Sequence, residues 1–198
     1  ADMRPLNVED YRMLARKRLP RGMFDYVDRG TEDEVGLRHL RQVLDAVKLL
    51  PSVLNDVSAP DTSVVVFEQK LPIPVVVAPT AVAGLVWHDG EVQIARAARH
   101  VGIPFCVSTQ SMTSIEDIEQ RARGATLWFQ LYVQQDRALT WRLLDRVKAA
   151  GVRTLLITAD TPRAPKKEWN ERNGFAIPIA PSVVGTIDVL RHPRWLMN

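Results

Sequence analysis

The chain has 198 residues, of which 46% are hydrophobic and 25% charged, and its formal net charge is +3. This composition is typical of a folded globular protein, and so small a net charge gives no indication of a nucleic-acid partner. The single cysteine, Cys106, excludes an internal disulfide framework and favours a reducing compartment, so we expect a cytoplasmic protein.

The first 62 residues predict a helical segment. Asn7 suits the N-cap of a first helix that is expected to end near Arg18. Pro20 suits the first turn of a second, shorter helix, and Gly30 is expected to end it. The chain therefore begins with at least two short helices in succession.

A third helix and a β-hairpin are expected next. Thr31 and Glu34 have the spacing of a capping box, which predicts a helix start. The apolar side of this helix is formed by Val35, Leu40, Leu44 and Val47. Further on, the β-rich runs 63–68 and 74–78 flank residues 69–72. These runs predict a hairpin that leads into the first main strand.

From residue 74 onwards, strands and helices alternate. The predicted strands are 74–78, 105–108, 126–133 and 154–159. The helices between them begin near Asp89, at Thr113 with Glu116, and at Asp136. Continuous apolar strands joined through helices and short loops indicate parallel βα units.

Polar side chains stand where the predicted strands end. These residues are Thr80, Ser108, Tyr132 and Thr158. Gln130 lies two positions before Tyr132, so both side chains point to the same face of their strand. Buried polar groups need partners, and two interpretations are open: bonds to neighbouring protein groups, or bonds to a ligand. The carboxyl ends of barrel strands share one face, where ligands bind.

The number of strands fits half of an eight-stranded (β/α)8 barrel. An open doubly wound sheet is the alternative, but the first βα loop, 78–84, lacks G-x-G-x-x-G, which argues against a Rossmann site. We therefore predict an α/β fold, the N-terminal half of a TIM barrel with four parallel strands. Residues 1–62 form the helical segment, 63–160 the hairpin and four barrel strands, and 161–198 a loop segment. The other half-barrel is absent from this chain.

Several short motifs share an order and spacing that is specific when they are taken together. They are Phe24-Asp25-Tyr26, Glu32-Asp33-Glu34, Ala78-Pro79-Thr80-Ala81, Asp89-Gly90-Glu91, Ser108-Thr109, Trp128-Phe129-Gln130-Leu131-Tyr132, Thr158-Ala159-Asp160-Thr161-Pro162 and Arg172-Asn173-Gly174-Phe175. In this order the chain resembles the N-terminal half of the FMN-dependent α-hydroxy acid oxidases and dehydrogenases, which include glycolate oxidase, lactate oxidase and mandelate dehydrogenase. The ending His192-Pro193-Arg194-Trp195 is most similar to the mandelate dehydrogenase branch.

The resemblance implies an FMN cofactor and a set of residues that bind it. An isoalloxazine ring needs backbone donors near N5 and polar groups along its pyrimidine edge. The implied cofactor-binding residues are Pro79, Thr80, Ala81, Ser108, Gln130 and Thr158. The first three would supply main-chain contacts near N5, and the other three would bond the polar edge. Without the resemblance, Ser108 and Thr158 are simple strand-end hydroxyls.

The resemblance also implies substrate-binding residues. Tyr26 would bond the substrate carboxylate, and Tyr132 would act at the substrate oxygen near the reacting carbon as the catalytic residue of this half. Lys167 aligns where the family usually has an arginine, and it offers a point charge in place of a bidentate fork. The alternatives are an amphipathic-helix role for Tyr26 and a solvated loop for Lys166 and Lys167. No metal site is expected.

The family's catalytic base is a histidine followed closely by an arginine, and the resemblance places that pair in the second half. The histidines of this chain are His39, His88, His100 and His192, and none matches the position. The chain alone is therefore expected to be inactive.

The final stretch, 177–198, mixes apolar residues with Arg191 and Arg194. In the mandelate dehydrogenase branch a segment here anchors the protein at the membrane surface, and basic-plus-aromatic amphipathicity would support that role. The alternative is an active-site lid or a helix packed on the barrel. We accordingly expect a cytoplasmic protein that is peripheral on the inner face of the cell membrane.

The function implied by the resemblance is FMN-dependent oxidation of an (S)-2-hydroxy acid to the 2-oxo acid, preferably with an aryl substrate such as mandelate. Oxygen or a quinone would accept the electrons, and the family resemblance implies a homo-oligomer, a tetramer. Two rivals stand beside this interpretation. One is another FMN barrel enzyme, such as a flavin-dependent isopentenyl diphosphate isomerase, and the other is a non-catalytic half-barrel module.

Overall fold

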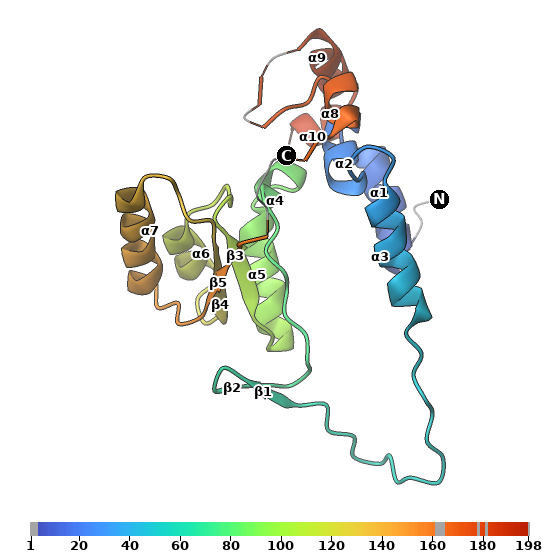
Figure 1. Cartoon of the computed structure of the whole chain (residues 1–198), viewed down its shortest axis with the longest axis vertical. Helices are drawn as coiled ribbons and strands as arrows, with labels where there is room; N and C mark the ends of the chain where they lie inside the picture. Colours follow the sequence, from blue (N-terminus) through green and yellow to red (C-terminus); the bar gives the residue numbers. More distant parts are fainter. Residues whose placement is uncertain (1–3, 161–164, 178, 181, 198) are drawn as a thin grey trace. The chain divides into compact units, whose positions relative to one another are not determined.

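The computed structural model describes residues 4–160, 165–177, 179–180 and 182–197 (Figure 1). The chain divides into two compact units. The first consists of Ala1–Val53 with Arg163–Asn198, and the second is Leu54–Pro162. No helix among the described residues is long and apolar enough to cross a membrane.

The first unit is helical. Its helices are α1 (Val8–Arg18), α2 (Arg21–Asp28), α3 (Val35–Ala46), α8 (Glu168–Arg172), α9 (Val183–Leu190) and α10 (Pro193–Leu196). The predicted cap of α1 is confirmed, because the Asn7 side chain accepts a hydrogen bond from the Asp10 N–H at 2.9 Å. The prediction for α2 is shifted by one residue: Pro20 is its N-cap, and the helix ends two residues before Gly30.

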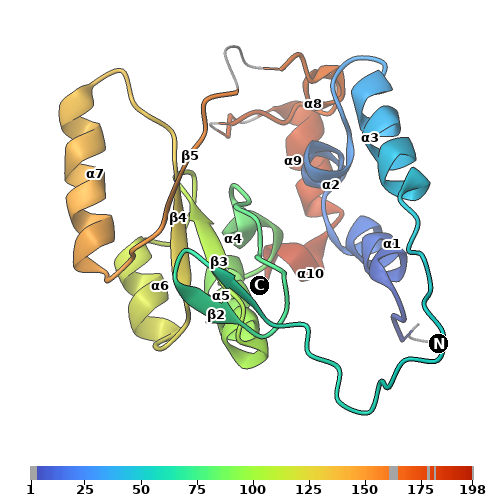
Figure 2. The same cartoon turned by 60° about the horizontal axis from the view of Figure 1, so that its bottom comes forward.

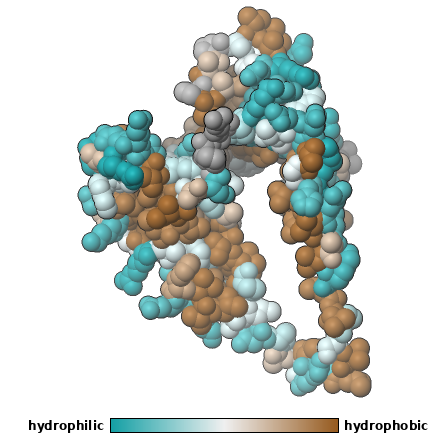
Figure 3. Space-filling view, in the orientation of Figure 1, coloured by the Kyte–Doolittle hydropathy of each residue, from teal (hydrophilic) through white to brown (hydrophobic). Residues whose placement is uncertain are grey.

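The predicted capping box of α3 is wrong. Glu34 is the N-cap residue itself, with a left-handed φ of 58° and no side-chain cap bond. Its carboxylate accepts a hydrogen bond from the Gly30 N–H at 3.2 Å and lies 3.4 Å from the Arg29 guanidinium. An arginine and a backbone donor thus attract this side chain away from the helix start. The apolar side of α3 is exposed, and Figure 3 shows apolar surface over this helix.

Helix α2 is held by a buried polar contact and by close packing. The Asn173 side-chain amide donates to the Asp25 carboxylate at 2.6 Å, and both residues are buried. A Cβ on Gly22 would lie 2.9 Å from the Cβ of Phe175, so only glycine allows α2 to approach this closely. Two motifs far apart in the sequence, 24–26 and 172–175, are joined in this way.

The second unit is an α/β structure. Its elements are β1 (Val64–Val66), β2 (Gln69–Leu71), α4 (Ala83–Val86), α5 (Gly90–Val101), β3 (Phe105–Ser108), α6 (Ile115–Arg121), β4 (Leu127–Leu131), α7 (Arg137–Ala149) and β5 (Leu155–Ile157). Strands β3, β4 and β5 form a parallel three-stranded sheet in that order (Figure 2). Three of the four predicted strands are therefore confirmed.

The remaining predicted strand, 74–78, contributes a single parallel bridge. Val77 donates to the Pro104 carbonyl at 2.9 Å and accepts from the Cys106 N–H at 3.0 Å. The prolines at 72, 74 and 79 explain the short pairing, because proline has no N–H to donate to a strand ladder.

The hairpin is present, but its turn lies earlier than predicted. Residues 69–71, expected in the turn, form strand β2 and pair antiparallel with β1. The turn is Phe67–Glu68, and both residues have positive φ, at 49° and 63°. Such a two-residue turn matches the twist of a hairpin, but it usually carries Asn or Gly, so the sequence offered no signal for it.

The core of the second unit lies between the sheet and helices α5, α6 and α7. Its largest fully buried apolar side chains include Phe105 and Ile118. Each such side chain contributes about 1.5–3 kcal/mol through burial. The Asp136 cap of α7 is confirmed by a 2.8 Å bond from the Ala138 N–H. The cap of α6 is Ser114, one residue later than predicted, because the Thr113 hydroxyl bonds another side chain, Glu91.

Candidate functional site

Three predicted site residues form a hydrogen-bonded row across the ends of the parallel strands. Ser108 and Gln130 occupy paired positions of β3 and β4. The Ser108 hydroxyl donates to Gln130 Oε1 at 3.3 Å, and Gln130 Nε2 donates to Thr158 Oγ1 at 2.8 Å. Ser108 and Gln130 are only 5% and 4% exposed. The parallel register therefore brings these three side chains together, as their positions in the sequence indicated.

Thr109 orients the amide at the centre of this row, and the sequence interpretation gave it no role. Its N–H donates to Gln130 Oε1 at 3.2 Å, and its hydroxyl donates to the Gln130 carbonyl at 2.5 Å. The same hydroxyl accepts from the Tyr132 N–H at 3.0 Å. With two donors on Oε1, the amide nitrogen faces Thr158. A second hydroxyl directly after Ser108 was the signal that could have found this residue.

The row Ser108–Gln130–Thr158 still has hydrogen-bond donors to offer after its internal bonds are made. A glutamine amide carries two N–H donors, and Gln130 uses one of them toward Thr158. Thr158 accepts that bond, and among the described residues its own hydroxyl donates to no acceptor. A ligand with carbonyl or ring-nitrogen acceptors could take both donors. The row is thus more than a self-contained core network.

The row borders an open hollow of about 680 Å³. Its lining residues are Pro79, Gln130, Leu156, Ile157, Thr158, Ala159 and Asp160. Within the described residues, no hydrogen bond uses the N–H groups of Thr80 or Ala81, which follow Pro79. Apolar walls with a few polar groups along one side suit a flat aromatic ligand with a polar edge. An isoalloxazine ring has this character, so the residues present fit that group.

Tyr132 also belongs to the second unit. It follows β4 directly and is half-buried, and its N–H is held by Thr109. The two-residue period of a strand predicts that the Tyr132 side chain shares a face with Gln130, two positions earlier. The predicted cofactor residues and the predicted catalytic tyrosine thus share one end of the sheet.

Tyr26 and Lys167 come together in the first unit. Lys167 Nζ donates to the Tyr26 carbonyl at 3.0 Å and lies 4.1 Å from the centre of the Tyr26 ring. Burial lowers the pKa of Lys167. Lys166 instead pairs with Glu168 at 2.9 Å. The solvated-loop interpretation therefore fits Lys166 but not Lys167, which is half-buried against the predicted substrate tyrosine.

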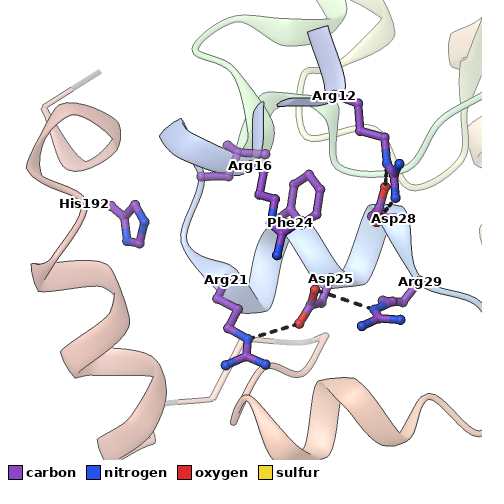
Figure 4. Close-up of a pocket in the computed structure, with 9 residues that line it drawn as sticks. Arg12, Arg16, Arg21, Phe24, Asp25, Asp28, Arg29 and His192 are labelled. Atoms are coloured by element: carbon purple, nitrogen blue, oxygen red, sulfur yellow. Dashed lines mark hydrogen bonds and ion pairs between the residues drawn. The ribbon is translucent and has the colours of Figure 1, made fainter. Parts of the chain in front are cut away.

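A second hollow, of about 560 Å³, lies in the first unit and was not predicted (Figure 4). Four arginines line it: Arg12, Arg16, Arg21 and Arg29. Arg12 bonds Asp28, whose pKa it lowers, while Arg21 and Arg29 lie 3.5 and 4.0 Å from Asp25. Because carboxylates compensate most of these charges, we assign no ligand to this hollow.

Metal-binding residues do not gather in the part of the chain that the structure describes. No group of three or more His, Cys, Asp or Glu side chains there could hold an ion. The buried thiol of Cys106 has its pKa raised to about 11 by burial, so it is an unreactive core group.

Comparison with known proteins identifies the family. Residues 15–198 match the family described as FMN-dependent dehydrogenase. The chain is 38% identical over 192 residues to (S)-mandelate dehydrogenase of Pseudomonas putida, covering 97% of this chain and 48% of that protein. It is 39% identical over 189 residues to L-lactate dehydrogenase of Bartonella tribocorum, covering 96% and 49%.

Solved structures agree with this assignment. A crystal structure described as the monotopic membrane protein (S)-mandelate dehydrogenase superposes with a TM-score of 0.90 at 36% identity, covering 98% of this chain and 52% of that one. The chain spans about half the length of the curated relatives it matches. The chain belongs to the FMN-dependent dehydrogenases, the family of the mandelate and lactate dehydrogenases.

Proposed function

We propose that the whole protein oxidises an (S)-2-hydroxy acid to the 2-oxo acid with FMN as its cofactor. The observation that carries this proposal is the row Ser108–Gln130–Thr158 beside an apolar hollow. Membership of the FMN-dependent dehydrogenases supports the cofactor. When bound, FMN supplies a two-electron acceptor for the oxidation of the hydroxyl-bearing carbon.

In this proposal two groups of residues would hold the cofactor. Gln130, Thr158 and Ser108 would bond the polar edge of the ring. The main chain of Pro79, Thr80 and Ala81 would supply contacts near N5. Support comes from the unused donors of the row and from the unbonded N–H groups after Pro79.

Three side chains of this chain are the proposed substrate-binding residues. In this proposal Tyr26 and Lys167 bind the carboxylate, and the Tyr132 hydroxyl bonds the oxygen on the reacting carbon. Supporting this, the Lys167 ammonium lies against the Tyr26 ring. Lysine gives a strong but non-directional anion contact, because it lacks the planar fork of arginine.

The base and the rest of the barrel belong to a second half of the protein. The relatives that this chain matches are about twice as long as the matched part. We propose that the missing half adds four βα units to the sheet, beginning beside β5, and brings the histidine–arginine pair. Strand β5 supports this order, because it is the edge of the sheet and Ile157 on it is 63% exposed.

An aryl acid such as mandelate is the substrate that we favour over lactate. The similarity to (S)-mandelate dehydrogenase supports it. Lactate is the second candidate, because L-lactate dehydrogenases match at the same level of identity. Oxygen or a membrane quinone would be the final electron acceptor.

We further propose that the protein is a cytoplasmic homo-oligomer, a tetramer, that binds the inner face of the cell membrane through 177–198. The relative's description as a monotopic membrane protein supports membrane binding. So does the exposure of apolar residues in this stretch, namely Ile179, Val183, Leu190, Leu196 and Met197. Arg191 and Arg194 would meet anionic headgroups there.

The test is anaerobic reduction of the purified, flavin-containing full-length protein. Mandelate should bleach the flavin absorbance, and lactate should do so more slowly. Faster bleaching by lactate would show that lactate is preferred over the aryl acid. Failure of every 2-hydroxy acid to bleach a bound flavin would favour another FMN barrel activity, such as an isomerase. A colourless protein that binds no FMN would favour the non-catalytic module.

A further inference from the structure

Glu91 is a buried carboxylate that none of the predicted roles uses. It lies in the first turn of α5 and is only 1% exposed. Its Oε1 accepts hydrogen bonds from the N–H groups of Gly84 and Met112, both at 3.1 Å. Its Oε2 accepts from the Thr113 hydroxyl at 3.0 Å. Every one of these partners is a donor.

These donors come from two separate strand-to-helix loops: the first, 79–89, includes the short helix α4, and the second is 109–114. Gly84 follows the stretch 79–81, and Met112 and Thr113 follow β3 and the Ser108–Thr109 pair. No salt bridge of the described residues includes Glu91. A buried acidic side chain without a cation depends on its hydrogen bonds, and bonds to a charged acceptor are the strong kind. Glu91 therefore ties the two loops to each other and to α5.

The space around Glu91 is closed to larger side chains. A Cβ on Gly84 would lie 3.0 Å from Glu91 Oε2, and a Cβ on Gly90 would lie 2.4 Å from the Ala83 carbonyl oxygen. Two non-glycine residues of the same loop, Val82 and Asp89, hold left-handed φ values of 50° and 56°. Such a backbone needs support from its surroundings. The Glu91 bonds supply it, together with a 3.1 Å bond from Val82 N–H to the Gln110 carbonyl.

We propose that Glu91 is a positioning residue of the flavin site. It fixes the loop of Thr80 and Ala81 relative to the row of Ser108, Gln130 and Thr158, so that main-chain donors and polar side chains face the same ring. This inference rests on the proposed FMN function. Glu91 itself touches neither cofactor nor substrate, and its effect passes through the two loops that it joins.

The test compares Glu91→Gln with Glu91→Leu in the full-length flavoprotein. Leucine removes both acceptor oxygens and with them all three hydrogen bonds, so the dissociation constant for FMN should rise about tenfold or more. Glutamine keeps a carbonyl oxygen for Gly84 and Met112, so its dissociation constant should stay within about threefold of the wild type. The visible circular dichroism of the bound flavin should change in the leucine variant and be restored in the glutamine variant.

Steady-state kinetics add a second readout. A shifted loop should lower kcat for the 2-hydroxy acid about tenfold with little change in KM, because Tyr26 and Lys167 still bind the carboxylate. Val147→Ala is the matched control. Val147 is a core residue of the same unit, so this variant loses stability without touching either loop. It should keep the wild-type flavin dichroism and kcat.

If Glu91→Leu does not fold, the Thr113→Val variant tests the positioning role instead. It removes the hydroxyl that donates to Glu91 and changes the shape of the side chain little. It should raise the FMN dissociation constant about threefold. Unchanged FMN binding and dichroism in Thr113→Val and in any folded Glu91→Leu would overturn the positioning role. A wild-type protein that binds no FMN would instead overturn the proposed function, and Glu91 would then have no flavin site to serve.

Discussion

The two units place their predicted site residues by different means. In the second unit, Ser108, Gln130 and Thr158 are set by the register of parallel strands and by the hydrogen bonds that join their side chains. In the first unit, Lys167 reaches Tyr26 through a long side chain, and many neighbouring contacts are ion pairs of exposed arginines. The geometry of the row Ser108–Gln130–Thr158 should therefore depend less on salt concentration and pH than the contacts of charged, flexible side chains do.

The largest effect should follow from Tyr132→Phe. If its hydroxyl bonds the reacting oxygen, kcat should fall about 100-fold while flavin content stays near that of the wild type. The measurement is steady-state turnover beside the flavin-to-protein absorbance ratio. Tyr11→Phe is the control, because Tyr11 is exposed on α1. Equal losses of turnover and flavin would show that Tyr132 serves the cofactor row.

Gln130→Leu should come next, with FMN bound about 10- to 50-fold more weakly. The change leaves the Ser108 hydroxyl without its side-chain acceptor, limits the Thr109 N–H to its bond with the residue-130 main-chain carbonyl, and removes the donor to Thr158. Fluorescence titration of apoprotein with FMN measures the affinity, and Gln93→Leu on the exposed side of α5 is the control. An unchanged affinity would contradict the cofactor role of the row.

Lys167 should make substrate binding depend on pH. Burial lowers the pKa of Lys167 below its ordinary value of 10.5, so its charge is lost as pH rises through that lowered value. KM for the hydroxy acid should then rise at alkaline pH, and Lys167→Met should raise KM about tenfold at neutral pH. Lys167→Arg should remove the alkaline rise, because arginine stays charged. A KM profile that is identical in all three proteins would exclude Lys167 from the substrate site.

The smallest effect should come from the arginine hollow of the first unit. Arg12 bonds Asp28, but its side chain is half exposed, so Arg12→Met should cost only about 0.5 kcal/mol of unfolding free energy. Asp28 has its pKa lowered by Arg12, so its stabilising contribution is present above the ordinary aspartate value and is lost as pH falls. Urea unfolding of the wild type and of Arg12→Met, at neutral and at acid pH, measures the cost of the substitution and its pH dependence. A loss of unfolding free energy above about 2 kcal/mol would contradict the surface character of this pair.

Local signals predicted the regular elements well. Apolar runs located β3, β4 and β5, and the caps at Asn7 and Asp136 need only neighbours within three residues. The two errors at helix starts arose where another group competes for the expected capping side chain. Glu34 is drawn to Arg29 and Gly30, and Thr113 bonds Glu91 across 22 positions, so both leave the helix start that their spacing predicted.

The candidate site shows the same difference between features with a local signal and features that depend on the folded chain. The polar residues at the strand ends could be found from the sequence, because the two-residue period of a strand decides which side chains share a face. Thr109 could have been noticed as a second hydroxyl after Ser108, but its bonds to Gln130 and those of Glu91 depend on which segments the folded chain brings together. The family resemblance predicted the cofactor and the roles of Gln130, Tyr132 and Tyr26. Composition and periodicity alone had left both the cofactor and these roles open.

The sequence by itself determined the three strands of the parallel sheet, most helices before β5 and the polar residues at the strand ends, because those features follow from hydrophobic periodicity and local capping; it did not predict α8, α9 and α10, which lie in the expected loop segment 161–198. Only the tertiary structure decided that Gln130 presents its amide nitrogen to Thr158, that Lys167 lies against Tyr26, and that Glu91 joins two loops. Those contacts join residues that are distant in the chain, and their geometry is set by packing and strand register.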